Sequence, residues 1–214
     1  MTSHVAPDAP GRALVGALVD AGLAPESDPR RIAEYSYDAS NYRVVPAAVL
    51  FPRSESEVAA ALAVCHRLGV PATARGGGTS MAGNAIGTGL VLDLSRHMNR
   101  VLEVDEAAGT VTAEAGTVLT ALREAVHAAT GDRLTFAPDP SSQSRACLGG
   151  AIGNDACGNH SVRHAGPPTT SRRCGSSPPT DCASPPPAAA SRPPIRPTRP
   201  PPPAPSTSPH GCRT

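Results

Sequence analysis

Three consecutive glycines, at positions 76, 77 and 78, constrain the fold of this chain more than any other sequence feature. They lie in the segment Arg-Gly-Gly-Gly-Thr-Ser-Met-Ala-Gly-Asn, which spans residues 75–84. Glycine adopts positive φ at little steric cost and leaves its N–H group unobstructed, so such a loop curls readily around an anion. The segment therefore predicts a phosphate-binding loop. The alternative that the residues alone leave open is a glycine-rich turn between two strands.

Two common phosphate motifs are excluded by single residues of this loop. Gly78 and Gly83 have the spacing of a Walker A motif, but Asn84 stands where that motif needs a lysine. The dinucleotide fingerprint needs a third glycine, and Met81 occupies that position without a long periodic helix after it. The loop therefore fits neither a nucleoside triphosphate site nor a Rossmann site.

The residues before the loop predict a βαβ unit. Residues 44–51 are apolar and rich in β-formers, and Ser54-x-x-Glu57 then forms a capping box that predicts a helix ending at Gly69. Residues 70–74 predict a second strand, parallel to the first and reached by a right-handed crossover. Ligands of open α/β sheets bind at the carboxyl ends of strands, which is where this loop begins. The expected buried face of the helix consists of Val58, Leu62, Cys65 and Leu68.

The other expected elements follow from periodicity and from turn residues. Residues 11–23 predict a short amphipathic helix with Leu14, Val15, Leu18 and Val19 on one face. Residues 35–42 hold all three tyrosines in a polar segment, which is either a surface loop or a ligand-contacting loop. Further along the chain we expect a strand at 90–94, a hairpin of 98–104 with 110–115, a helix at 118–128 with Val118, Leu122 and Val126 on one face, and a brief strand at 134–136.

A second unusual stretch covers residues 136–161. Its first half is rich in proline and serine, and its second half has a glycine every few residues with small apolar residues between them. Glycines permit close approach of the backbone to a flat ligand, and serines can hydrogen-bond a pyrophosphate. Together with the first loop, this stretch indicates a dinucleotide held between two glycine-rich edges.

Composition separates the body of the chain from its C-terminal end. From position 167 onward the chain is mostly Pro, Ser, Thr, Arg and Ala, which predicts disorder. The body is mildly acidic and lacks a basic face interleaved with aromatics, so a nucleic-acid partner is not expected. The six cysteines show no Cys-x-x-Cys pair, which favours reduced thiols and no metal site. No signal peptide and no apolar run of membrane-spanning length is present, and the expected location is the cytoplasm.

These motifs carry a family resemblance. Leu-Phe-Pro-Arg-Ser at 50–54, Ala-Arg-Gly-Gly-Gly-Thr-Ser at 74–80, Val-Leu-Asp-Leu-Ser at 91–95, Ala115-Gly116, and Pro-Asp-Pro-Ser through Gly-Gly-Ala-Ile-Gly-Asn at 138–154 resemble the FAD-binding domain of the vanillyl-alcohol oxidase and p-cresol methylhydroxylase type. Within it, the chain most resembles the FAD-linked D-2-hydroxyacid dehydrogenases. The implied fold is α+β: a βαβ N-terminal subdomain plus a second mixed α+β subdomain, incomplete in this chain. The implied organisation is a helical lead-in at 1–29, an FAD-binding domain at 30–166 and a disordered tail at 167–214.

The resemblance also implies a set of FAD-binding residues. They are Arg75, Gly76, Gly77, Gly78, Thr79, Ser80, Gly83 and Asn84 around the pyrophosphate, and Pro138, Asp139, Ser141, Ser142, Gly149, Gly150, Gly153 and Asn154 along the flavin. Thr79 fills the region where some relatives attach FAD through a histidine, so non-covalent FAD is expected. His97 and His160 are expected to be turn or surface residues, because these relatives take their base and substrate-binding groups from a later domain.

The chain departs from the family pattern after position 166, where it turns into proline-rich sequence. A frameshift in a GC-rich gene would produce such a tail, and the alternative is a genuine polyproline linker. The expected function is the FAD-binding portion of an enzyme that oxidises a D-2-hydroxyacid by hydride transfer to flavin, passing electrons to an acceptor the sequence does not identify. The fragment alone is expected to be inactive. The alternative function is a non-catalytic nucleotide-binding or scaffold module with a proline-rich interaction tail.

Overall fold

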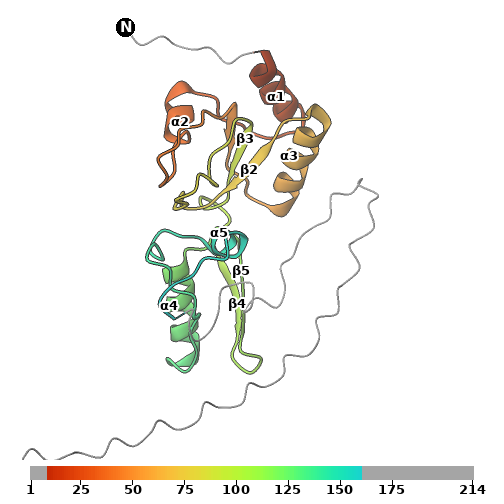
Figure 1. Cartoon of the computed structure of the whole chain (residues 1–214). Coiled ribbons are helices and arrows are strands. Elements are labelled where there is room, and N and C mark those ends of the chain that lie inside the picture. Colours follow the sequence, from red (N-terminus) through yellow and green to blue (C-terminus); the bar gives the residue numbers. More distant parts are fainter. Residues whose placement is uncertain (1–8, 161–214) are drawn as a thin grey trace, which may run out of the picture. The chain divides into compact units, whose positions relative to one another are not determined.

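A computed structural model of the protein describes residues 9–160, and the tail predicted to be disordered lies outside these residues. The first part contains α1 (Ala9–Asp20), α2 (Pro29–Glu34), β1 (Ala48–Leu50), α3 (Glu55–Leu68), β2 (Ala72–Arg75) and β3 (Leu90–Asp93) (Figure 1). The next part contains β4 (Val101–Asp105), β5 (Thr110–Ala113), α4 (Leu119–Thr130) and α5 (Leu148–Gly153). The mixture of helices and strands agrees with the α+β class expected from the sequence.

The first part is built on a three-stranded parallel sheet in the order β1-β3-β2. The predicted parallel arrangement of β1 and β2 is confirmed, since both pair in parallel with β3, but β3 lies between them. Arg75 pairs with Asp93, so β2 and β3 end at the same edge of the sheet. The glycine loop begins at this edge, directly after Arg75.

Local signals at both ends determine the length of α3. Ser54 is its N-cap, and the Ser54 Oγ accepts the N–H of Glu57 at 3.3 Å. The Glu57 carboxylate accepts the N–H of Arg53 at 2.9 Å, one residue before the position that a standard capping box uses. Gly69 ends the helix with φ 63°, in the left-handed region that favours glycine.

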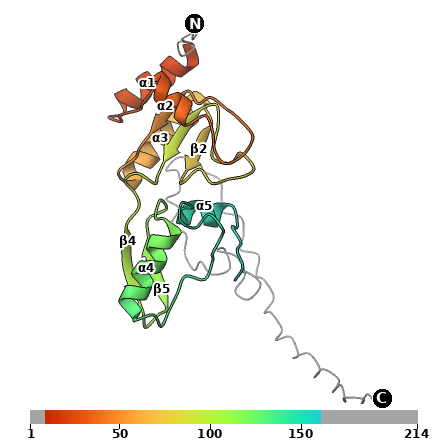
Figure 2. The ribbon, with the colours of Figure 1, turned by 90° about the vertical axis from the view of Figure 1, so that its left-hand side faces the viewer.

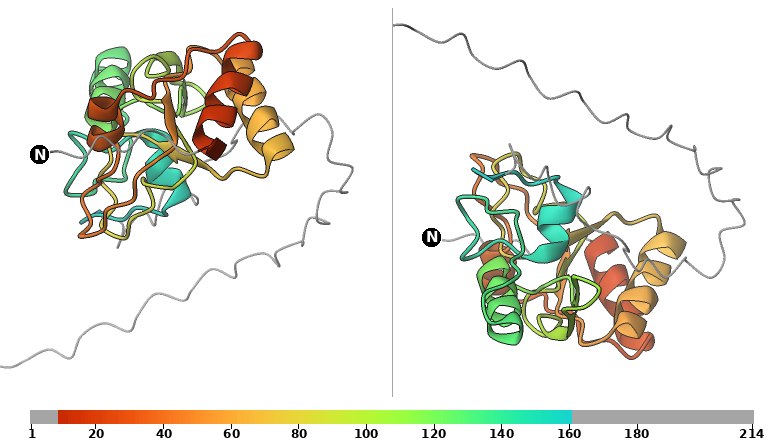
Figure 3. Two further views of the ribbon diagram at one scale, coloured as in Figure 1. Left: turned by 90° about the horizontal axis from the view of Figure 1, so that it is seen from above. Right: turned by 90° about the horizontal axis from the view of Figure 1, so that it is seen from below.

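The core of the first part lies between the sheet and the two helices α1 and α3, which run side by side (Figures 1 and 3). Leu14 and Leu18 of α1 are fully buried there. Each fully buried leucine stabilises the fold by about 1.5–3 kcal/mol. The predicted buried face of α3 is correct for Cys65 and in part for Val58, which is half-buried. It is wrong for Leu62 and Leu68, which are exposed, while Ala61 and Val64 are buried instead. α3 packs on α1 as well as on the sheet, and this second contact turns a different face inward.

The hairpin predicted after the sheet is confirmed. β4 and β5 pair antiparallel, and Gly109 in the turn has φ 61°. α4 lies beside this hairpin (Figure 2) and ends at Gly131, whose φ is 56°. The buried face of α4 is Leu119, Leu122, Val126 and Thr130, so Leu122 and Val126 are where the periodicity places them, while Val118 is the N-cap.

The brief strand predicted at 134–136 is absent from the described structure. The N–H of Leu134 donates to the Thr130 Oγ1 at 3.2 Å, and this contact ties the segment to the end of α4. Phe136 instead packs against a small core of Leu119, Ala146 and Ala151. An apolar run of three residues does not specify a strand without a partner strand beside it.

Gly116 and Gly16 offer a matched test of the close contact between the segment after β5 and the end of β3. A Cβ at Gly116 would lie 2.1 Å from the Leu94 carbonyl oxygen, whereas a Cβ at Gly16 in α1 would have nothing within 4 Å. We expect Gly116→Ala to lower the free energy of unfolding by about 1–3 kcal/mol through overpacking. Gly16→Ala should raise it by about 0.5–1 kcal/mol, because alanine favours a helix over glycine. Urea titrations measure both, and equal effects would contradict the described contact at Gly116.

Glu114 should make the stability of the fold depend on acid pH. Its carboxylate accepts the Arg100 N–H at 2.7 Å and pairs with the Arg100 Nη2 at 2.8 Å. The hydrogen bond from the Arg100 side chain lowers the pKa of Glu114, against the opposing effect of burial. A lowered folded-state pKa stabilises the protein above the unfolded-state value of about 4.3, and this stabilisation is lost as the pH falls. The stability difference between wild type and Glu114→Gln should therefore shrink below about pH 4 in urea titrations, and a pH-independent difference would contradict this assignment.

Candidate functional site

The glycine loop leaves the sheet at Arg75 and presents unused backbone N–H groups. The Leu94 N–H still donates to the Arg75 carbonyl at 2.9 Å, as the last contact along this edge. Gly78 then takes φ 65° and curls the chain. The N–H groups of residues 78–81 make no hydrogen bond with any residue of the described range 9–160. Consecutive free N–H groups in a curled loop form a concave site for an anion.

Ser80 stabilises the shape of this loop through its side chain. Its Oγ accepts the N–H groups of Ala82 and Asn84, each at 3.2 Å. Gly83 follows with φ 80°, and a Cβ there would lie 3.1 Å from the Tyr42 ring. The hydroxyl of Ser80 is therefore an acceptor within the loop.

Gly76 and Gly77 are required by contact with the second stretch of the chain. A Cβ at Gly77 would lie 2.0 Å from the Arg145 carbonyl oxygen, and a Cβ at Gly76 would lie 2.8 Å from the Cys147 Cβ. Burial raises the pKa of Cys147, and the Gly77 N–H lowers it only in part. The two stretches are thus in direct backbone contact, and the Cys147 thiol is kept neutral.

The second stretch is held in place by backbone hydrogen bonds to the segment before α4. The N–H of Leu148 donates to the Thr117 carbonyl, and the N–H of Gly149 donates to the Ala115 carbonyl, both at 2.8 Å. A Cβ at Gly149 would lie 2.9 Å from the Ala115 Cβ, so this glycine is needed for packing. At Gly150, one residue later, a Cβ would meet nothing within 4 Å.

A pair of asparagine side chains also joins the glycine loop to the second stretch. The Asn84 Nδ2 donates to the Asn154 Oδ1, and the Asn154 Nδ2 donates to the Gly150 carbonyl at 2.9 Å. The end of the first loop is therefore linked to the end of α5.

Asp139 and His160 form a separate contact within the second stretch. The Asp139 carboxylate accepts the backbone N–H of His160 at 3.0 Å, and its Oδ2 lies 2.7 Å from the His160 Nδ1. These hydrogen bonds, led by the backbone one, lower the pKa of Asp139. His160 is exposed, as the sequence predicts, and it anchors the segment after α5.

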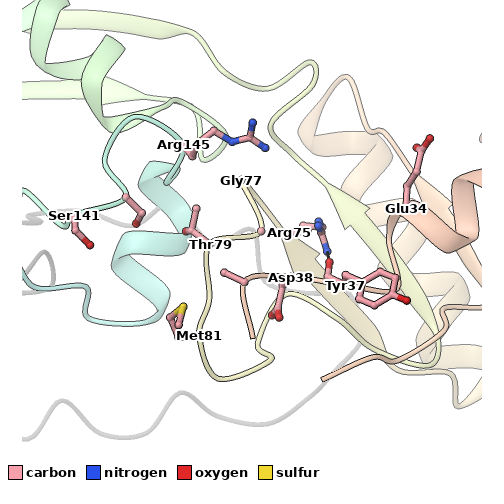
Figure 4. Close-up of a pocket in the computed structure, with 12 residues that line it drawn as sticks. Glu34, Tyr37, Asp38, Arg75, Gly77, Thr79, Met81, Ser141 and Arg145 are labelled. Atoms are coloured by element: carbon pink, nitrogen blue, oxygen red, sulfur yellow. Dashed lines mark hydrogen bonds between the residues drawn. The ribbon is translucent and has the colours of Figure 1, made fainter. Parts of the chain in front are cut away.

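Two adjoining pockets lie between the stretches. One measures about 530 Å³ (Figure 4) and the other about 380 Å³. Both are lined by Gly77, Gly78, Thr79, Met81 and Ser142. The curled loop with its free N–H groups is thus shared by the two pockets.

Most of the residues predicted to bind a cofactor line these pockets. Those that line one pocket or both are Arg75, Gly76, Gly77, Gly78, Thr79, Ser80, Asn84, Ser141, Ser142, Gly150 and Asn154. Those that line neither are Gly83, Pro138, Asp139, Gly149 and Gly153. Pro138 is fully buried, and Gly149 packs against Ala115, so both belong to the frame around the pockets.

The segment 34–39 is a wall of the larger pocket that sequence reasoning did not place there. It contributes Glu34, Tyr37, Asp38 and Ala39 to the lining. The Ala39 N–H donates to the Gly78 carbonyl at 3.0 Å and joins this segment to the glycine loop. The available signal was the cluster of tyrosines in a polar segment, which left a surface loop and a ligand-contacting loop as alternatives. The lining also includes Arg145 and Cys147, whose positions depend on the packing of the second stretch.

Arg75 holds this wall in place through hydrogen bonds and a ring contact. Its Nη1 donates to the Tyr37 carbonyl at 2.7 Å and to the Ala85 carbonyl at 3.1 Å, and its Cζ lies 4.9 Å from the centroid of the Tyr35 ring. The Tyr35 hydroxyl donates to the buried Asp93 at 2.5 Å. Burial, followed by this hydrogen bond, raises the pKa of Tyr35, so the phenol keeps its proton and donates it in the hydrogen bond to Asp93.

Residues 9–160 contain no cluster of side chains that would hold a metal ion. No helix among them has the length and apolar character needed to cross a membrane. The described cysteines, at 65, 147 and 157, are free thiols.

Comparison with known proteins identifies the family. The FAD binding domain profile matches residues 46–167. D-2-hydroxyglutarate dehydrogenase of Escherichia coli is 42% identical over 130 residues, which are 59% of this chain and 12% of that protein. Glycolate oxidase subunit GlcD of Bacillus subtilis is 37% identical over 133 residues, 61% of this chain and 27% of that protein. An uncharacterized FAD-linked oxidoreductase of Mycobacterium tuberculosis is 39% identical over 121 residues, 56% of this chain and 25% of that protein.

Solved structures support the same fold. Alkyldihydroxyacetonephosphate synthase matches with a TM-score of 0.65 and 22% identity, over 76% of this chain and 33% of that one. Chitooligosaccharide oxidase matches with a TM-score of 0.62 and 21% identity, over 73% of this chain and 33% of that one. The chain spans about an eighth to a quarter of the length of the curated relatives named above. The resemblance drawn from the motifs is confirmed: the chain belongs to the FAD binding domain family, and FAD is the cofactor of this domain.

Proposed function

We propose that residues 30–166 form the FAD-binding unit of a flavin-dependent oxidoreductase, with the FAD diphosphate bound by the N–H groups of residues 78–81. The observation that carries the proposal is that these successive N–H groups have no partner among residues 9–160 and belong to residues that line the pockets. Gly78, Thr79 and Met81 line both pockets, and Ser80 lines the smaller one. Phosphate oxygens are strong acceptors, and such N–H groups have to be satisfied by water or by a ligand.

The second stretch supports the proposal from the other side of the site. Gly150 lines the smaller pocket, and the space where its Cβ would stand is open. A flat ring system needs such a wall, because a side chain there would occupy the space beside the ring. Ser141 and Ser142 add hydroxyl groups to the larger pocket. We place Gly83, Pro138, Asp139, Gly149 and Gly153 in the supporting frame of the FAD site.

FAD is held without a covalent bond in this proposal. Residues 75–84 contain neither histidine nor cysteine. The Cys147 thiol lines the smaller pocket, but burial raises its pKa, and a neutral thiol is a poor nucleophile. The proposed location of the protein is the cytoplasm, where free thiols such as Cys65 and Cys147 stay reduced.

The Gly150→Leu variant tests FAD binding. A leucine at this position fills space that the structure leaves open to the pocket, while glycine is a poor helix former, so the helix itself should not be weakened. We expect the dissociation constant of FAD, measured by quenching of flavin fluorescence, to rise at least about tenfold, or about 1.4 kcal/mol. Acid precipitation of the wild-type complex should release the flavin into the supernatant.

Gly16→Leu is the matched control for this experiment. Gly16 lies in α1, lines neither pocket, and also has nothing within 4 Å of its Cβ position. This variant should bind FAD as the wild type does. A wild-type chain that shows no visible absorbance of bound flavin after addition of FAD would refute the proposed function, and flavin that stays in the acid precipitate would refute non-covalent binding.

We propose D-2-hydroxyacids as the substrate class, which is the class that the names of the relatives indicate: D-2-hydroxyglutarate and glycolate. Bound FAD supplies the hydride acceptor, and the protein binds and orients it. Two groups near the site that could exchange a proton already have structural partners: the Tyr35 hydroxyl donates to Asp93, and His160 contacts Asp139. The chain alone is therefore proposed to bind FAD without oxidising the hydroxyacid.

Two measurements separate this proposal from a non-catalytic module. The chain with bound FAD should not be bleached by D-2-hydroxyglutarate, D-lactate or glycolate under anaerobic conditions. A chimera that carries the matching 130 residues in place of those of the Escherichia coli D-2-hydroxyglutarate dehydrogenase should oxidise D-2-hydroxyglutarate. Bleaching of the chain alone would show that it is catalytically competent. A chimera that folds, binds FAD and oxidises no hydroxyacid would favour the non-catalytic module.

A further inference from the structure

Four charged side chains line the larger pocket, and three of them already have partners. They are Glu34, Asp38, Arg75 and Arg145. Glu34 pairs with the Arg31 Nη1 at 2.5 Å. The Asp38 carboxylate accepts the N–H of Ser40 at 2.9 Å and the N–H of Ala85 at 3.3 Å.

Arg75 is also engaged with the protein. Its guanidinium donates to the carbonyl groups of Tyr37 and Ala85 and stacks on the Tyr35 ring. It lies directly under the loop, because a Cβ at Gly78 would be 2.6 Å from its Nη2. Arg75 therefore contacts the loop and holds the pocket wall through its Nη1 and its stacking on Tyr35.

Arg145 differs from the other three in having a fixed backbone and a free head group. Its N–H donates to the Ser142 carbonyl at 2.8 Å, and its carbonyl oxygen lies against Gly77. Its guanidinium makes no hydrogen bond, ion pair or ring contact with any residue of the described range. Figure 4 shows its side chain extending over Gly77, on the opposite side of the pocket from Glu34.

We propose that Arg145 is a further FAD-binding residue, whose guanidinium binds the diphosphate together with the N–H groups of residues 78–81. This inference rests on the proposed function. N–H groups supply only partial charge, and the nearby carboxylates of Glu34 and Asp38 oppose the entry of an anion. A guanidinium supplies the missing full charge and two parallel donors that match phosphate oxygens. The carbonyl group of Arg145 lies against Gly77, so the backbone that carries the donor is positioned before FAD arrives.

The test is the affinity of Arg145→Ala for FAD and for ADP, which shares the diphosphate but lacks the flavin. Loss of a charge-assisted hydrogen bond should weaken both affinities by about 10- to 100-fold. Arg145→Lys keeps the charge but loses the bidentate geometry, and it should show an intermediate loss. The control is Arg53→Ala, which removes the same charge from an exposed residue that lines neither pocket and should change neither affinity.

The outcomes separate this inference from the proposed function on which it rests. Affinities of Arg145→Ala within twofold of wild type would overturn the assignment, as would a loss for FAD alone, which would place Arg145 at the flavin end. If Arg145→Ala fails to unfold cooperatively, Arg145→Gln, which keeps most of the side chain's length, should show the same loss for both ligands. A wild-type chain that binds ADP but not FAD would refute the proposed function, and the affinity for ADP would then still test the role of Arg145. A wild-type chain that binds neither ligand would refute both the proposed function and this inference.

Discussion

The proposed FAD site depends on one close contact, between the backbone of Gly77 and the carbonyl oxygen of Arg145. A Cβ at position 77 would lie 2.0 Å from that oxygen, far inside any normal approach. The contact brings two stretches that are distant in sequence to the same place and makes both of them walls of the same two pockets. Since the second stretch is also hydrogen-bonded to the segment before α4, this contact ties the parallel sheet's loop to the following hairpin and helix.

Some polar groups around this contact have hydrogen-bond partners within the chain, and others do not. Arg75 donates to the Tyr37 carbonyl, Asp38 accepts the Ala85 N–H, and the Ser80 hydroxyl accepts the Ala82 N–H, so these three groups already have partners within the chain. The N–H groups of residues 78–81 and the guanidinium of Arg145 have no such partners among the described residues. Polar groups at a functional site are often unsatisfied by the protein because the ligand completes them. The distribution of satisfied groups is therefore more informative here than the list of lining residues.

Features that depend on neighbouring residues were predictable from the sequence. The capped start of α3, its end at Gly69 and the hairpin around Gly109 use signals within a few residues of each other. Features that depend on distant partners were not. The insertion of β3 between β1 and β2, the buried face of α3 and the missing strand at 134–136 all follow from which segments pack together. An alanine-rich helix such as α3 has no strongly apolar stripe, so packing against α1 decided its face.

The sequence by itself determined the kind of site. Three consecutive glycines without a following lysine, paired with a proline- and glycine-rich second stretch, predict a diphosphate-binding loop, and these motifs carry the resemblance to the FAD family, because they are local. The tertiary structure decided the task of each residue. Gly76, Gly77 and Gly149 serve contacts within the chain, Gly150 leaves space open, Arg75 supports the wall and Arg145 is left free. Those roles depend on distances between segments far apart in the chain, and a linear sequence does not contain such distances.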